Sequence, residues 1–207
     1  MKILFQGDSI TDSARAKTES NWLASKGCGY ATIVSGKLGY DYPNEYEFIN
    51  RGISGNRVTD LLARIQCDMI NLEPDVMSIL IGVNDVWHEI QNQNGVNDVL
   101  FEAVYDLLLT ELKKALPNTR IMILEPFVLK ASATEPHWEQ FEQGVAAKAA
   151  ASKRVAEKHG LEFIPLQEKF LEALKKAPAS YWLLDGVHPT SAGHELIAQE
   201  WIKAFKH

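Results

Sequence analysis

Cysteine is scarce in this sequence. Only Cys28 and Cys67 occur among 207 residues, without a CxxC spacing and without a neighbouring histidine cluster. A disulfide framework and a structural zinc site are therefore not indicated. A chain of this length also buries enough surface to need neither. We expect a reducing compartment and a cytoplasmic protein, with no metal and no cofactor.

Long apolar runs and an excess of basic residues are also missing. No run approaches the roughly 18 residues that a membrane span requires, and the apolar stretch at residues 3–5 is too short for a signal peptide. Lys and Arg number 21 against 27 Asp and Glu, a formal charge of −6. Because nucleic-acid binders need a basic face, we expect neither a nucleic-acid partner nor a membrane partner.

The remaining composition is that of an ordinary globular protein, with 46% hydrophobic and 23% charged residues. The chain has no internal repeat and no linker rich in Gly, Ser or Pro. One domain spanning residues 1–207 is expected.

Short apolar runs alternate with longer amphipathic stretches. Runs typical of strands cover residues 3–5, 46–50, 76–81, 120–124 and 162–166, and patterns typical of helices cover residues 58–72, 100–112, 144–159 and 191–205. Residues 12–29 and 126–137 are expected to form long loops. Alternating strands and helices predict an α/β fold, a flavodoxin-like three-layer α/β/α sandwich with a five-stranded parallel sheet. In such sheets, ligands bind beyond the carboxyl ends of the strands.

The predicted strand ends are followed by residues whose side chains or N–H groups could take part in a reaction. Gly7-Asp8-Ser9 follows the first strand, where Ser9 is either an exposed nucleophile on a tight turn or a plain helix cap. Gly52 and Gly55 follow the second strand. Either their N–H groups face a cavity, or the two glycines simply allow the loop to turn before the next helix. Arg51 and Arg57 in the same loop could bind an anion, although solvated loop arginines are commoner.

An asparagine follows the third predicted strand. Asn84 offers an uncharged N–H donor for a developing oxyanion, or else an Asx turn in a loop. Asp85 is interpreted as a structural loop carboxylate, and Trp87 as a candidate pocket wall.

A carboxylate and an imidazole lie three residues apart near the C-terminus. A single turn could bring Asp185 to the ring of His188, fixing the tautomer that a general base needs. His194 is interpreted as structural. Together the four segments contain a nucleophile, oxyanion donors and an oriented base, the groups required for acyl transfer.

These residues, in this order, resemble the four sequence blocks of the SGNH hydrolases, also called GDSL esterases. The resemblance extends from residue 7 to residue 190, and the strings at residues 50–56 and 81–87 are similar to the bacterial branch that includes acetyl xylan esterases. It implies ester hydrolysis without a metal, with Ser9 as nucleophile, His188 as base and Asp185 as its orienting acid. It also implies an oxyanion hole formed by the Ser9 and Gly52 N–H groups and the Asn84 side chain.

The expected substrate is a small-molecule or oligosaccharide ester, most simply an acetylated carbohydrate, in a pocket that includes Asp8, Trp87 and Trp182. A lysophospholipase or thioesterase acting on longer acyl chains would use the same groups with a deeper apolar groove. A non-catalytic flavodoxin-like ligand-binding module is the alternative from a different class. The apolar and aromatic loops leave room for a homo-oligomer.

Overall fold

Five parallel strands form the centre of the fold in a computed structural model, which describes residues 1–18 and 24–206. The strand order is β2-β1-β3-β4-β5, and every neighbouring pair is parallel. The strands are β1 (Lys2–Gly7), β2 (Glu47–Asn50), β3 (Val76–Leu80), β4 (Arg120–Leu124) and β5 (Glu162–Ile164). The predicted sheet is confirmed, with strand ends shifted by one or two residues.

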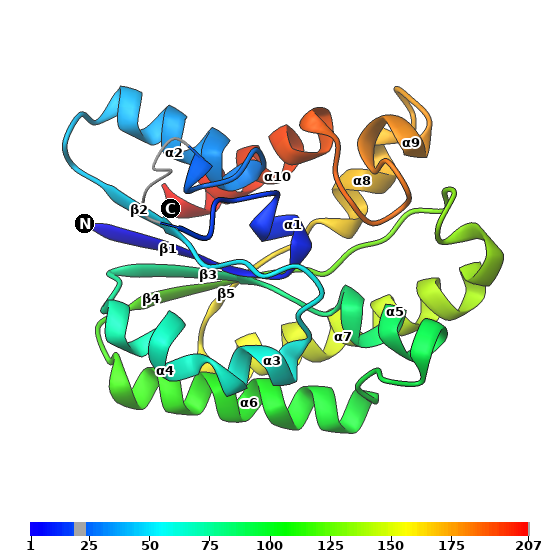
Figure 1. The fold of residues 1–207 in the computed structure, drawn as a ribbon, viewed down its shortest axis with the longest axis horizontal. Coiled ribbons are helices and arrows are strands. Elements are labelled where there is room, and N and C mark those ends of the chain that lie inside the picture. Colours follow the sequence, from blue (N-terminus) through cyan, green and yellow to red (C-terminus); the bar gives the residue numbers. More distant parts are fainter. Residues whose placement is uncertain (19–23, 207) are drawn as a thin grey trace.

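Helices cover both faces of this sheet (Figure 1). One layer contains α2 (Tyr30–Asp41), α8 (Gln167–Ala173) and α10 (Ser191–Phe205), and the other contains α3 (Val58–Ala63), α6 (Asp98–Ala115) and α7 (Trp138–His159). Along β4, Met122 and Leu124 pack into the first layer's core, while Ile121 and Ile123 pack into the second. This alternation explains why the central strands are mostly apolar, since both faces of the sheet are covered by helices.

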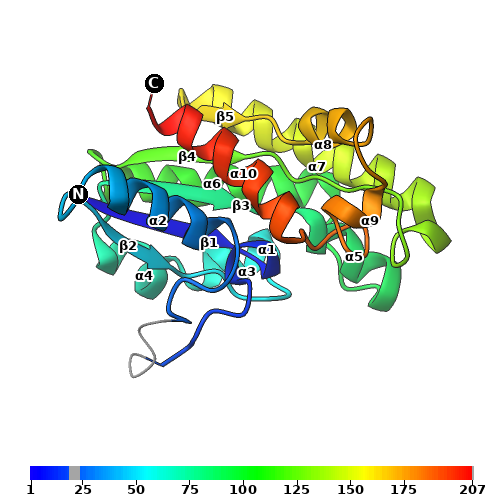
Figure 2. The same ribbon diagram turned by 90° about the horizontal axis from the view of Figure 1, so that it is seen from above.

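Seven shorter or peripheral elements are also found in the described part of the chain. They are α1 (Ser9–Asp12), α4 (Ile65–Asp68), η2 (Ile70–Leu72), α5 (Val83–Asn92), η3 (Glu135–His137), α9 (Ala179–Trp182) and the isolated bridge between Leu183 and Pro189. Seen from above, α2 and α10 lie side by side across the sheet, and α9 lies near the start of α10 (Figure 2).

Several helices have no counterpart among the predicted elements. Asn84 and Asp85 were interpreted as loop residues but lie in α5, and nothing was predicted for the segments that form α2, α8 and α9. In addition, α7 begins at Trp138, six residues before the predicted start. The expected loop at residues 12–29 begins after α1 and includes residues 19–23, which lie outside the described residues.

The predicted helix over residues 58–72 is instead three short segments, α3, α4 and η2. The helix is interrupted at Arg64, whose backbone has φ −112° and ψ 17°. The Arg64 guanidinium donates hydrogen bonds to the carbonyls of Arg51 and Gly7 at the sheet edge, at 2.8 and 3.1 Å. The spacing of apolar residues alone therefore does not predict that the helix is interrupted at Arg64.

The strand order places the functional segments. The chain moves from β1 to β2 on one side and returns to β3 on the other, so the crevice where ligands bind lies beyond the carboxyl ends of β1 and β3. Ser9 and Asn84 follow these two strands. Among the described residues, no helix is both long and apolar enough to cross a membrane.

Candidate active site

Ser9 is the first residue of α1 and directly follows the end of β1. The turn is tight, because a Cβ atom on Gly7 would lie 2.4 Å from the Leu80 carbonyl oxygen. Asp8 caps the helix, its Oδ1 accepting the Ile10 N–H at 2.9 Å. The N–H of Ser9 lies in the first helical turn and has no partner within the helix.

The imidazole of His188 joins Ser9 to Asp185. Its Nε2 lies 2.9 Å from Ser9 Oγ, and its Nδ1 lies 2.7 Å from Asp185 Oδ2. A serine bonded to a histidine that is itself bonded to a carboxylate is the arrangement by which serine hydrolases activate a nucleophile.

Local backbone contacts hold the carboxylate and the ring in place. Asp185 Oδ1 accepts the N–H groups of Val187 and His188 at 2.9 and 2.8 Å. The Leu184 N–H donates to the His188 carbonyl at 2.8 Å, which closes the turn. The three-residue spacing in the sequence therefore corresponds to one compact loop before α10.

The ionisation of the pair suits a general base. Burial raises the pKa of Asp185, but its hydrogen bonds to His188 and Val187 outweigh this effect and lower the pKa to about 2. The hydrogen bond to Asp185 raises the pKa of His188 above its ordinary value; burial opposes this change, while the charges of Asp185 and Asp8 add to it. At neutral pH Asp185 is an anion that favours the imidazolium.

Asn84 lies in the first turn of α5 and is 6% exposed. Its Nδ2 donates to the carbonyl of Asn56 at 3.1 Å. A side-chain amide has two N–H groups, so this bond orients the group and leaves a second donor.

Gly52 does not supply a free donor, contrary to the expectation from the sequence. Its N–H donates to Asn50 Oδ1 at 2.8 Å, in a buried position. A Cβ atom on Gly52 would lie 2.3 Å from the Asp12 backbone nitrogen. This glycine is therefore required for close packing of its loop against α1.

Gly55 has the properties expected of Gly52. Its φ of +83° requires glycine, and a Cβ atom there would meet only His88, at 4.0 Å. Ser54 on one side bonds to Asp12 at the end of α1, and Asn56 on the other bonds to Asn84. Among the described residues, no hydrogen bond from the Gly55 N–H is found. The Gly-Asn pair, which favours positive φ, is the signal in the sequence that could have identified it.

The three candidate pocket residues occupy different environments. The Trp87 ring lies 5.7 Å from that of His188 between ring centres, and packs edge-on against Phe141. Asp8 is 1% exposed and lies behind Ser9, so its carboxyl group does not line an open pocket.

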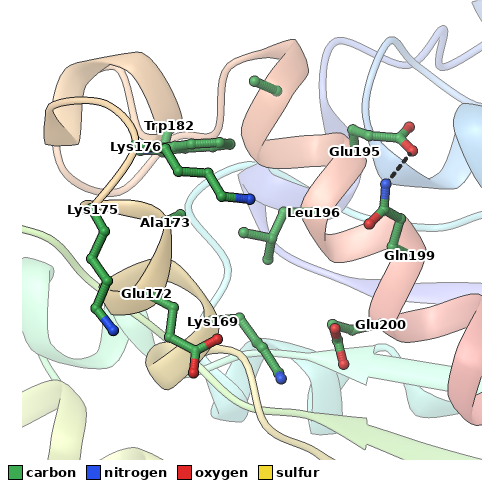
Figure 3. A pocket seen from close by; sticks show the side chains of 11 residues that line it. Lys169, Glu172, Ala173, Lys175, Lys176, Trp182, Glu195, Leu196, Gln199 and Glu200 are labelled. Carbon is green, nitrogen blue, oxygen red and sulfur yellow. Dashed lines mark hydrogen bonds between the residues drawn. The ribbon is translucent and has the colours of Figure 1, made fainter.

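Trp182 faces a separate cleft of about 550 Å³ between α8 and α10 (Figure 3). Charged side chains line it, and the Trp182 ring lies at one end; they are Lys169 and Glu172 of α8, Lys175 and Lys176 just beyond α8, and Glu195 and Glu200 of α10. The cleft does not include Ser9, Asn84 or His188. Trp182 is nevertheless connected to the loop that carries Asp185 and His188, because its carbonyl accepts the Thr190 N–H at 2.9 Å.

Comparison with known proteins agrees with the fold and this arrangement. Residues 5–196 match the GDSL-like Lipase/Acylhydrolase family, and the chain belongs to this family. An acetylxylan esterase from Geobacillus stearothermophilus is 34% identical over 208 residues, covering 98% of this chain and 92% of that protein.

Solved structures extend the similarity. A Parabacteroides merdae protein described as a GDSL-like lipase has a TM-score of 0.93 at 36% identity, covering 99% of this chain and 95% of that chain. A mutant of Axe2, a Geobacillus acetyl-xylooligosaccharide esterase, has a TM-score of 0.87 at 33% identity, covering 100% and 94%. These findings confirm the predicted family, the α/β fold and the class of carboxylic ester hydrolase.

Proposed function

We propose that this esterase removes acetyl groups from carbohydrates through an acyl intermediate on Ser9. The observation that carries the proposal is the 2.9 Å contact between Ser9 Oγ and His188 Nε2, together with the bond from His188 Nδ1 to Asp185. With Asp185 ionised, Nδ1 carries the ring proton and its N–H donates a hydrogen bond to the carboxylate, which leaves Nε2 free to accept the serine proton.

The reaction proceeds in two stages. Ser9 Oγ attacks the ester carbonyl carbon while its proton moves to His188 Nε2, and a tetrahedral oxyanion forms. The bond to the alcohol oxygen then breaks, and His188 returns the proton to the leaving alcohol. Water repeats the sequence on the acyl-serine, releasing acetate and restoring Ser9.

The oxyanion is assigned to three donors, the N–H groups of Ser9 and Gly55 and the second N–H of Asn84. Gly55 replaces the Gly52 of the sequence interpretation because the Gly52 N–H is already bonded to Asn50. Preorganised donors of this kind stabilise the charge that develops in the transition state.

The relatives support both the residues and the acetyl substrate. Three structures of Axe2 are described as catalytic mutants, with a serine, an aspartate and a histidine replaced by alanine. The separations along the chain between those residues equal the separations between Ser9, Asp185 and His188. The acetyl-xylooligosaccharide specificity stated for Axe2 favours acetylated xylo-oligosaccharides as substrates here.

Trp87 favours a small acyl group. The indole packs against His188 on one side and Phe141 on the other, so it forms a fixed aromatic wall beside the reacting atoms. A rigid wall at this position leaves little room for a long acyl chain.

The test is hydrolysis of p-nitrophenyl acetate and p-nitrophenyl octanoate by the wild-type protein and by Ser9→Ala. We expect a strong preference for acetate and no activity in the variant. Acetate release from acetylated xylo-oligosaccharides should then exceed the release from small alkyl acetates. A preference for octanoate would favour a lipase or thioesterase, and no serine-dependent activity on any ester would favour a binding module.

We also propose a cytoplasmic protein that forms a homo-oligomer. Both cysteines are free and exposed, and Tyr181 and Leu184 beside the catalytic loop are 56% and 67% exposed. Light scattering of the purified protein tests the oligomer, and fractionation of the source cells tests the compartment.

A further inference from the structure

Two buried carboxyl groups lie behind the catalytic residues. Asp8 and Asp85 are each 1% exposed; Asp8 precedes Ser9 in the chain and Asp85 follows Asn84. In each, Oδ1 accepts a backbone N–H, from Ile10 at 2.9 Å and from Val58 at 3.1 Å.

The second oxygen of each group has no such partner. Asp8 Oδ2 and Asp85 Oδ2 are buried and form no hydrogen bond within the part of the chain that the structure describes. A buried carboxylate without full hydrogen bonding is costly, so a fold that retains two of them beside a reactive serine calls for a physical explanation.

The two carboxyl groups differ in the positively charged group that acts on each of them. The charge of Lys148 in α7, which forms an ion pair with Asp98, favours ionisation of Asp85, and the charge of Asp85 acts on the buried Tyr105 hydroxyl of α6. The charge of Asp8 acts on buried Tyr30 of α2, whose hydroxyl lies 3.0 Å from Thr11 Oγ1. Asp8 directly precedes Ser9, whose Oγ lies 2.9 Å from His188 Nε2, and His188 is the positive group that acts on Asp8.

The two buried acids also act on each other, since the charge of Asp8 opposes ionisation of Asp85. Burial raises the pKa of Asp8 to about 7, with the Ile10 N–H and the charge of His188 acting in the opposite direction. Protonation of His188 and ionisation of Asp8 therefore favour each other. The imidazolium also forms during the reaction, when Ser9 passes its proton to His188.

We propose that Asp8 is a positioning residue for the esterase reaction, and that its buried carboxylate stabilises the His188 imidazolium as Ser9 attacks. This role rests on the proposed function. Asp185 holds the far nitrogen of the ring through a direct hydrogen bond, whereas Asp8 acts through its charge from behind the nucleophile. Asp8 does not contact the substrate.

The main test is Asp8→Asn. The amide oxygen keeps the acceptor for the Ile10 N–H, so the helix cap survives while the charge is lost. We expect the acid limb of the kcat/KM profile to move to lower pH by about one unit, with a fall of about tenfold on the plateau and an unchanged KM. Asp8→Ser, which also keeps a capping acceptor, should give the same shift if Asp8→Asn does not fold.

Asp85→Asn is the matched comparison, because it neutralises an equally buried carboxyl group. The positive charge that acts on Asp85 comes from Lys148, not from His188. It should move the acid limb much less than Asp8→Asn. Equal shifts in both variants would overturn the specific role of Asp8.

A second measurement separates this proposal from the proposed function. NMR titration of the His188 ring in Ser9→Ala, with and without Asp8→Asn, does not depend on ester hydrolysis. We expect a lower His188 pKa when Asp8 is neutral. An unchanged titration would overturn the proposal even in an active esterase. A shifted titration with no serine-dependent hydrolysis would reject both the proposed function and the role in catalysis.

Discussion

Asn50 Oδ1 accepts the backbone N–H of Gly52 at 2.8 Å, so the loop after β2 binds its own first glycine. Asn50 Nδ2 also donates to the Thr11 carbonyl at 2.6 Å, which ties the same loop to α1. The asparagine thereby fixes the loop against α1 and uses the N–H that the family resemblance assigned to the oxyanion hole. For the second glycine, Gly55, no hydrogen bond from the N–H is found within residues 1–18 and 24–206.

The first prediction concerns this assignment of donors. In a complex with a covalent phosphonate on Ser9, the phosphoryl oxygen should lie within hydrogen-bond distance of the Gly55 and Ser9 nitrogens and of Asn84 Nδ2. It should not approach the Gly52 nitrogen, which stays bonded to Asn50. A crystal structure of that complex decides the matter, and a phosphoryl oxygen bonded to Gly52 would contradict the assignment.

The second prediction concerns the side-chain donor. Asn84→Ala should lower kcat by about 10²–10³, because one donor to the transition state is lost. Loss of the Asn84 bond to Asn56 should cost only about 1 kcal/mol in the free energy of unfolding. Asn118→Ala, at an exposed turn before β4, serves as the control and should keep wild-type kinetics. Wild-type turnover in Asn84→Ala would remove Asn84 from the mechanism.

The third prediction concerns the orienting carboxylate. Asp185→Asn places an amide against His188 Nδ1 and removes the charge that favours the imidazolium, so kcat should fall by about 10³–10⁴. The backbone bonds to Oδ1 should survive, since an amide oxygen also accepts N–H groups. Steady-state kinetics and thermal unfolding measured together distinguish this effect from misfolding. Near-normal turnover would mean that Asp185 is not the orienting group.

The sequence was sufficient to predict the sheet and to select Ser9, Asp185 and His188, which the fold brings into contact. All five strands are short and mostly apolar; β1, β3 and β4 are almost entirely buried, while β2 and β5 at the edges of the sheet are partly exposed. Ser9, Asp185 and His188 could be placed because a strand end and a three-residue loop are local features. Their contact across 179 positions of the chain follows from the fold.

Side-chain contacts made at a distance account for what the sequence did not predict. α5 carries an apolar stripe at Val83, Val86, Trp87 and Ile90, but the polar Asn84 and Asp85 at its start favoured a loop. In α2, Gly36 and Gly39 weaken an otherwise regular pattern, and the helix is secured by packing against α10. The Gly52 N–H is bonded to the side chain of Asn50, a contact that no spacing rule identifies.

The fourth prediction concerns acyl selectivity. Trp87→Ala removes the aromatic wall beside His188, so activity on p-nitrophenyl butyrate or octanoate should rise relative to acetate. We expect the ratio of kcat/KM values to change by about tenfold, the usual effect of a small change in an apolar pocket. Trp182→Phe is the comparison, since Trp182 faces the cleft between α8 and α10, and it should leave the ratio unchanged (Figure 3). An unaltered ratio in Trp87→Ala would remove Trp87 from the acyl pocket.

The fifth prediction concerns His194, which is 6% exposed and faces the interior. Its Nδ1 accepts the Tyr30 N–H at 3.1 Å, so the neutral ring carries its proton on Nε2, which lies 3.3 Å from Ser13 Oγ. A second proton on the ring would sit on Nδ1 and make it a hydrogen-bond donor, directly opposite the Tyr30 N–H, which is also a donor. Burial, and then the charge of His188, lowers the pKa of His194 to about 4.

Because the unfolded chain binds this proton near pH 6.5 and the folded chain only near pH 4, folding stability falls as the pH drops through that interval. The loss by pH 4.5 should be about 2.5 kcal/mol. Asp8 and Asp85 titrate in the opposite sense, so the contribution of His194 is isolated by comparing urea unfolding of wild type and His194→Gln at pH 7 and pH 4.5. Wild type should be the more stable at pH 7, and the difference should shrink at pH 4.5. An equal difference at both pH values would show that His194 does not resist protonation in the folded protein.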